Sequence, residues 1–311
     1  MKGYRAIYFT KYTGFQLVLF SFLLLCLVSC RPSNENPSPP WEDFVIFREG
    51  NFPLIIVAPH GGDLKPQWIE DRDCANSVIT QDQYTLGIAL QLEEKLKTLG
   101  IEPFMVLTKI HRIKVDLNRS LTTSHCEDDT SNELWRLFHR QIEDYSSQVA
   151  NEFGQGLLID LHGHGHSVQR IELGYLLSGQ QLRDFSQSGN PAQSIQTSID
   201  GLLANHPRNQ PLDSLIFGAE SLGTLLSNNG FPATPSQQDP APLEGQPFFS
   251  GGSNTKNYGS SEGGQIDAIQ IEMNREGLRQ TSQDRERFTQ AFAEILAQYM
   301  RYHYADVTSS L

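Results

Sequence analysis

Gly156-Leu-Leu-Ile-Asp-Leu-His162 is a short apolar run that ends in a histidine, and Pro53-Leu-Ile-Ile-Val-Ala58 is a similar run two residues before His60. Runs of this length, rich in branched aliphatic residues and bounded by glycine or proline, are typical of buried strands. Three further strands are predicted at Ile101–Thr108, Ile171–Leu177 and Ala268–Glu272.

Between these runs, apolar residues recur at helical spacing in three segments, Thr80–Leu99, Ser131–Phe153 and Ser282–Tyr302. Strands that alternate with helices predict an α/β domain with a mostly parallel, doubly wound sheet covered on both sides. The stretch from Gly179 to Ser261 has little periodicity beyond Ile195–Leu203 and Leu215–Leu226, so we expect long loops over the top of the sheet. Within it, Phe248–Asn254 suits either a flap that covers a substrate or a mobile surface excursion.

The N-terminal residues have the features of an export signal, because three basic residues precede an uncharged apolar run from Phe15 to Val28. That run is too short to span a bilayer comfortably. Leu27-Val-Ser-Cys30 resembles the lipobox of bacterial lipoproteins, which predicts a signal peptide over residues 1–29 and a lipid anchor on Cys30. An ordinary secretory signal cleaved near Ser29, or an uncleaved anchor, is the alternative. Export to the bacterial cell envelope, at the outer membrane or the periplasmic or extracellular face, is the expected location.

The segment from 30 to 40 is polar and rich in proline, which predicts a tether ahead of a folded catalytic domain over residues 41–311. Loss of three basic residues with the signal takes Lys+Arg from 24 to 21, against 36 Asp+Glu, so the net charge becomes −15. This charge argues against nucleic acid or an anionic membrane surface as the partner. In an oxidising compartment Cys74 and Cys126 can form a disulfide, and two free thiols or a metal-binding thiol are the alternatives.

Two histidines at the ends of predicted strands are candidate metal ligands. His60 lies in Pro59-His-Gly-Gly62, and His162 is followed by Gly163, His164, Gly165 and His166. Ligands bind at the ends of strands in open α/β sheets, and two glycine-flanked histidines at such ends favour a zinc site over two structural histidines. Asp160 lies on the same side of its strand as His162 and could accept the second ring proton of a ligand histidine. His164 and His166 are either flexible donors beside the site or surface residues.

Two histidines and one carboxylate make an open zinc site that leaves a position for water. Asp63, three positions after His60, and Asp82, at the start of the next helix, are both candidates for the carboxylate. Either could instead be a helix cap or a solvated charge.

Polar residues for catalysis and substrate binding follow two other strands. Glu272 ends an apolar strand and would be costly to bury without a role, so it is the candidate general base. Asn118 and Arg119 follow the strand at 101–108, and the Arg119 guanidinium can bind a substrate carboxylate in a bidentate manner. Arg279 is a further candidate for substrate binding, with ion pairing to a nearby acid as the alternative.

These motifs, taken in order, resemble the N-formylglutamate amidohydrolase family across about residues 50–300. The motifs are Pro59-His-Gly-Gly62, Asp82 before a helix, Val115-Asp-Leu-Asn-Arg119, Asp160-Leu-His-Gly163 and Ile269-Gln-Ile-Glu-Met-Asn-Arg275. The family is similar to zinc carboxypeptidases, so the resemblance implies a three-layer α/β/α architecture with a mostly parallel mixed sheet. It also implies zinc held by His60 and His162, with Glu272 as the base, and it favours Asp82 over Asp63 as the acidic ligand.

The resemblance predicts a zinc-dependent hydrolase that cleaves the amide bond of an N-acyl amino acid or a peptide-like substrate with a carboxylate. Export and the long stretch between Gly179 and Ser261 favour an extracytoplasmic substrate over formylglutamate itself. The main alternative is a lipid-anchored binding protein that uses a hydrolase-like pocket without turnover. A second alternative is an enzyme that acts on an ester or an acetylated sugar, because water activated on zinc serves all of these reactions.

Overall fold

The computed structural model describes residues 40–126, 129–188 and 195–304. The predicted signal peptide, its lipobox and nearly all of the predicted tether lie outside these residues. Within the described ranges, no helix is long and apolar enough to cross a membrane.

A mixed seven-stranded sheet forms the centre of the domain, in the order β1-β3-β2-β4-β7-β5-β6. The strands are β1 (Val45–Arg48), β2 (Leu54–Ala58), β3 (Phe104–Thr108), β4 (Gly156–Gly163), β5 (Ile171–Gly174), β6 (Ala233–Thr234) and β7 (Ile266–Met273). The four central strands β3, β2, β4 and β7 are parallel, whereas β1 is antiparallel to β3 and β5 is antiparallel to β7. The prediction of a mostly parallel mixed sheet is confirmed.

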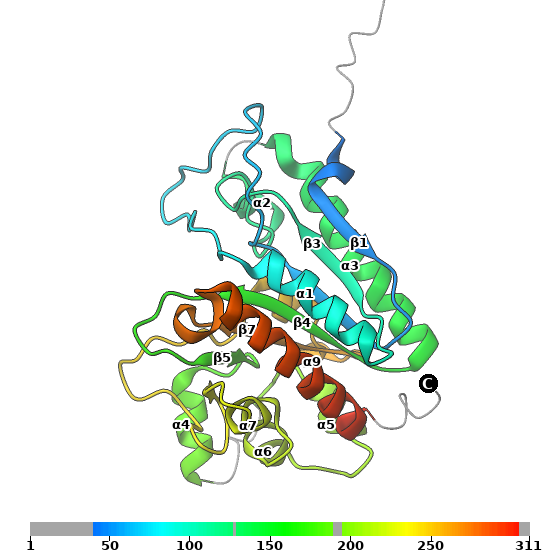
Figure 1. Cartoon of the computed structure of the whole chain (residues 1–311), viewed down its shortest axis with the longest axis vertical. Helices are drawn as coiled ribbons and strands as arrows, with labels where there is room; N and C mark the ends of the chain where they lie inside the picture. Colours follow the sequence, from blue (N-terminus) through cyan, green and yellow to red (C-terminus); the bar gives the residue numbers. More distant parts are fainter. Residues whose placement is uncertain (1–39, 127–128, 189–194, 305–311) are drawn as a thin grey trace, which may run out of the picture. The chain divides into compact units, whose positions relative to one another are not determined.

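Helices cover both faces of this sheet (Figure 1). Helices α1 (Thr85–Thr98) and α9 (Ser282–His303) lie together on one face, and α3 (Asn132–Phe153) lies on the other. The alternation along β2 explains both layers, because Leu54 and Ile56 pack into the core with α1 and α9, whereas Ile55 and Val57 pack into the core with α3. A strand buried on both faces needs the continuous apolar run seen in the sequence.

The stretch from Gly179 to Ser261 corrects one prediction, because it contains short helices instead of long loops over the sheet. They are α4 (Gly179–Ser188), α5 (Asp200–Asn205), α6 (Leu212–Phe217), α7 (Leu222–Asn228) and α8 (Ser253–Tyr258). Leu182, Leu215 and Leu225 bury their side chains in the same core as α1 and α9. Most of these helices have only one or two turns, so the sequence shows periodicity only at Ile195–Leu203 and Leu215–Leu226, which overlap α5, α6 and α7.

The remaining elements are short. They are helix α2 (Leu121–Ser124), the 3₁₀ turns Trp41–Phe44, Asp129–Ser131 and Ser260–Glu262, and the turn Arg275–Arg279. A disulfide joins Cys74 to Cys126, 52 positions apart, which was one of the alternatives that the sequence left open. It closes the part of the chain that contains Asp82, Asn118 and Arg119.

Candidate metal centre and catalytic site

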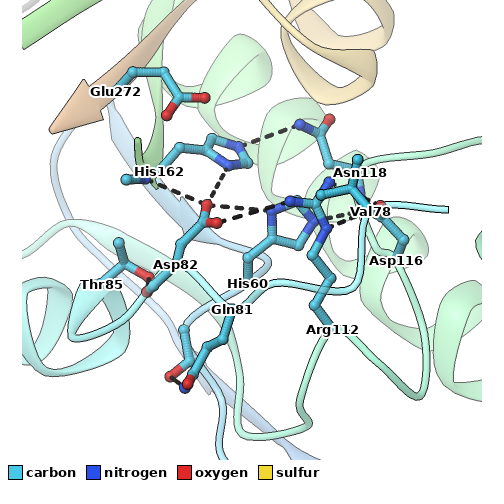
Figure 2. A network of polar contacts seen from close by, with 12 residues as sticks. His60, Val78, Gln81, Asp82, Thr85, Arg112, Asp116, Asn118, His162 and Glu272 are labelled. Atoms are coloured by element: carbon cyan, nitrogen blue, oxygen red, sulfur yellow. Dashed lines mark hydrogen bonds and ion pairs between the residues drawn. The ribbon is translucent and has the colours of Figure 1, made fainter. Parts of the chain in front are cut away.

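Three candidate ligands from three different elements meet at one end of the parallel strands. His60 lies two residues beyond β2, Asp82 lies shortly before α1, and His162 lies near the end of β4. Oδ2 of Asp82 is 3.3 Å from Nδ1 of His60 and 3.0 Å from Nδ1 of His162 (Figure 2). All three side chains are buried, and their ligand atoms are close enough to hold one metal ion.

Two glycines after His60 allow this convergence. A Cβ on Gly61 would lie 2.3 Å from the backbone nitrogen of Leu86, and one on Gly62 would lie 2.1 Å from the carbonyl carbon of Lys109. Any other residue would therefore push the loop away from the start of α1 and from the end of β3. The Asp82 backbone N–H donates to the His60 carbonyl at 3.1 Å, which fixes the two ligand-bearing segments together.

The second ring nitrogen of each histidine lies against another carboxylate. Nε2 of His60 is 2.6 Å from Oδ1 of Asp116, and Nε2 of His162 is 3.0 Å from Oδ2 of Asp160. Metal-binding histidines need such partners, which fix the tautomer and the ring orientation. Asp160 lies beside His162 as predicted, but among the described residues its Oδ2 has no hydrogen-bond partner, whereas Asn118 Nδ2 lies 3.3 Å from Nε2 of His162. The contact between Asp116 and His60 was not predicted, although Asp116 belongs to the motif Val115-Asp-Leu-Asn-Arg119, because nothing in the sequence showed which histidine it would reach.

Arg112 holds Asp116 in turn. Its Nε and Nη2 both donate to Oδ2 of Asp116, at 3.0 and 2.9 Å, which leaves Oδ1 for His60. Its Nη1 also lies 3.7 Å from Oδ1 of Asp82. Sequence reasoning missed Arg112, because an arginine in a loop is usually a surface residue.

The charges of this cluster fit a divalent cation. Burial alone would lower the pKa of His162, but the carboxylates of Asp160 and Asp82 outweigh it and raise that pKa well above its ordinary value. Burial would raise the pKa of Asp82, and the charges and hydrogen bonds of His60 and His162 lower it instead. The buried acids therefore require positive charge nearby, and two imidazole nitrogens with one carboxylate oxygen are a ligand set that zinc accepts.

Glu272 lies on β7 next to the candidate metal ligands, as the register partner of His162 on β4 (Figure 2). Its side chain is buried, and Gln270 Nε2 donates to its Oε1 at 2.9 Å. Burial raises the pKa of Glu272 to about 8, with His162 opposing the shift and Asp82 adding to it. A carboxylate with a pKa raised in this way is suited to accept a proton from water and to return it to a leaving group.

The structure does not bring Asp63 to the position predicted for it. Asp63 is exposed and accepts a hydrogen bond of 2.6 Å from Gln81 Nε2, so it lies outside the ligand group.

Arg279 is buried and lines the cavity. Its Nε, Nη1 and Nη2 donate to the backbone carbonyls of Met273, Gln83 and His164 at 3.0, 2.7 and 2.8 Å, which gives it a structural role. Its role in substrate binding stays a prediction.

Arg119 and Asn118 differ in how they face the site. Arg119 is exposed and lines a cavity of about 810 Å³ together with His60, His162 and Glu272. Asn118 is buried, and its Oδ1 accepts a hydrogen bond of 2.8 Å from the backbone N–H of Asn254. Arg119 thus remains available to a substrate, whereas Asn118 fixes the end of the Phe248–Asn254 segment against the site.

The predicted flap forms part of the cavity wall. Phe249, Gly251 and Gly252 line the cavity, and a Cβ on Gly252 would lie 2.3 Å from Nδ2 of Asn118. The segment therefore lies close over the site, and its predicted function as a substrate cover stays a prediction.

Fold and site together define a three-layer α/β/α protein with a candidate metal centre at the ends of its parallel strands. No protein-family model and no curated protein matches the chain. The structure is similar to that of N-formylglutamate amidohydrolase from Ralstonia eutropha JMP134, with a TM-score of 0.54 and 14% identity over 85% of this chain and 99% of that one. At this identity the likeness establishes a shared fold.

Two other solved structures are more distant. A gene product of Agrobacterium tumefaciens has a TM-score of 0.49 and 13% identity over 83% of this chain and 93% of that one. The apo N-acetylmuramyl-L-alanine amidase of Mycobacterium abscessus has a TM-score of 0.40 and 12% identity over 79% of this chain and 98% of that one.

Proposed function

We propose that this chain is a zinc-dependent hydrolase that cleaves an amide bond in an N-acyl amino acid or peptide-like substrate with a carboxylate. The observation that carries the proposal is the convergence of His60, Asp82 and His162 with the buried Glu272 in one cavity. The fold shared with a solved N-formylglutamate amidohydrolase supports amide hydrolysis as the reaction type.

Each residue has a defined task in this reaction. His60, Asp82 and His162 would hold zinc, which supplies a Lewis acid and lowers the pKa of water at the site. Glu272 takes a proton from water and transfers it to the nitrogen of the departing amine. Arg119, exposed at the cavity wall, binds the substrate carboxylate and so orients the amide bond.

We further propose that the protein acts outside the cytoplasm, as a lipoprotein anchored through Cys30. The lipobox-like sequence and the polar tether support this location. The disulfide between Cys74 and Cys126 also suits an oxidising compartment.

The decisive experiment is the substitution Glu272→Gln, with Glu262→Gln as the matched control because Glu262 is an exposed glutamate. Glu272→Gln should lower kcat by about 10²-fold to 10⁴-fold on N-acyl amino acids and peptides while the zinc content stays near that of the wild type. Glu262→Gln should behave as the wild type does. Unchanged turnover in Glu272→Gln would exclude Glu272 as the base, and a wild type that binds ligand without turnover would identify a binding protein.

A further inference from the structure

A second histidine of the cavity wall, His166, is paired with a buried carboxylate outside the candidate metal centre. Nδ1 of His166 is 2.9 Å from Oε1 of Glu172, whose side chain is fully buried on β5. Oε2 of Glu172 accepts a hydrogen bond of 2.8 Å from the backbone N–H of Phe249. The Phe249 ring stacks on the His166 imidazole, with centroids 4.6 Å apart and an angle of 17° between the planes. One carboxylate thus fixes both rings.

The hydrogen bonds of His164 argue against a second metal ion here, although His164, His166 and Glu172 have suitable ligand atoms near one another. Nε2 of His164 lies 2.8 Å from the carbonyl of Arg170 and therefore carries a proton. Its Nδ1 then accepts the backbone N–H of His166 at 3.1 Å. Both nitrogens of His164 are occupied, so this residue shapes the turn that presents His166.

One ring nitrogen of His166, Nε2, is available to a ligand. Because both oxygens of Glu172 accept hydrogen bonds, Nδ1 of His166 carries the proton and Nε2 offers a lone pair. Within the described ranges no protein group donates to this Nε2, and His166 and Phe249 both line the cavity. Phe249 is 43% exposed, so its free face is available for apolar contact.

One cavity contains the candidate metal ligands and extends to the proposed second site. Its wall includes Arg119, His162, Glu272, His166 and Phe249. The cavity volume of about 810 Å³ exceeds what a single N-acyl amino acid needs, so a chain of several residues fits it.

We propose that His166 and Phe249 form a substrate subsite on the β5 side of Glu272, and that the substrate is a peptide-like chain of several residues. The inference rests on the proposed function and specifies its substrate. Nε2 of His166 accepts a hydrogen bond from a substrate N–H, and Phe249 packs against the adjoining apolar part. Glu172 is a positioning residue, because it acts through the two rings that it holds.

The test compares two probes on the zinc-loaded full chain, N-acetyl-L-glutamate and an N-acetylated pentapeptide of four alanines with a C-terminal glutamate. In His166→Ala we expect kcat/KM for the pentapeptide to fall about tenfold, mostly through KM, and to fall less for the short probe. Glu172→Gln should give a similar loss that does not add to that of His166→Ala. His166→Gln, which keeps an acceptor, should recover part of it, and Ser167→Ala is the exposed neighbouring control.

Each outcome of this test either supports or overturns the proposed subsite. Equal loss for both probes, or none for either, would overturn the subsite while leaving the proposed hydrolase intact. If the wild type cleaves neither probe, the proposed function fails, and calorimetric binding of the pentapeptide then decides. Binding about tenfold weaker in His166→Ala supports the subsite, whereas equal binding or none overturns it.

Discussion

Glu172 and Glu272 lie directly opposite each other across the antiparallel pair of β5 and β7. Side chains at such positions share one face of the sheet, and two buried acids there are unfavourable unless each has a partner. Glu172 has His166, and Glu272 is the register partner of His162 on β4. Burial is the main cause of the raised pKa of Glu272, and the charge of Glu172 adds to it. The sheet thus places Glu272, which lines the cavity, opposite Glu172, which holds the cavity-lining His166.

The acidic metal ligand can be tested by a pair of substitutions. Asp82→Asn should remove bound zinc, because Oδ2 of Asp82 lies between the two histidine nitrogens. Asp63→Asn should keep about one zinc per chain, since Asp63 is exposed and bonded to Gln81. Elemental analysis after dialysis measures both. Loss of zinc in Asp63→Asn with retention in Asp82→Asn would transfer the ligand role to Asp63.

Asp116 should control zinc affinity without contacting the metal. Asp116→Asn removes the carboxylate that orients His60 and leaves Arg112 without its charged acceptor. Loss of such an outer partner typically weakens metal binding by about 10-fold to 100-fold. Competition with a fluorescent zinc chelator gives the affinity, with Asp71→Asn as a control that changes an exposed carboxylate on the same part of the chain. Equal affinities in Asp116→Asn and the wild type would refute this role.

Substitutions of Arg279 and Arg275 test whether Arg279 stabilises the fold or binds substrate. Arg279→Gln should lower the free energy of unfolding by on the order of 3 kcal/mol, because three backbone carbonyls lose a charged donor. Arg275 is exposed at the same cavity, so Arg275→Gln should leave stability nearly unchanged. Urea denaturation measures both variants. Wild-type stability in Arg279→Gln together with a raised KM would restore the substrate role predicted for it.

The sequence was most informative where a residue follows a strand. His60, His162 and Glu272 end apolar runs, and the strand ends bring them together, as parallel strands of one sheet require. Asp116 and Arg112 could not be placed, because the path of a loop after its strand depends on packing that no local pattern encodes. The bonds of Arg279 to backbone carbonyls could not be predicted either, since backbone carbonyls leave no mark in the sequence. The edge strands β1 and β6 were missed because they are only four and two residues long.

The fold should lose stability in acid because a buried pair of histidines, His206 and His303, becomes protonated. His303 is the last residue of α9. Arg208 N–H donates to Nδ1 of His206, Nε2 of His206 lies 2.9 Å from Nδ1 of His303, and Nε2 of His303 lies 2.8 Å from the carbonyl of Glu220. These bonds are all satisfied only when both imidazoles are neutral. Burial lowers the pKa of His303 to about 4 and also lowers the pKa of His206.

The folded pKa of His303 lies below its unfolded value of about 6.5, so its stabilising contribution is present above that pH and is lost as the pH falls toward 4. The shift corresponds to about 3 kcal/mol. Urea denaturation at pH 7.5 and at pH 4.5 should therefore show a smaller loss of stability in His303→Gln than in the wild type. Gln298→Ala, on the same helix, removes no titrating group and should keep the wild-type difference. If His303→Gln loses as much stability in acid as the wild type does, protonation of this pair does not drive the acid transition.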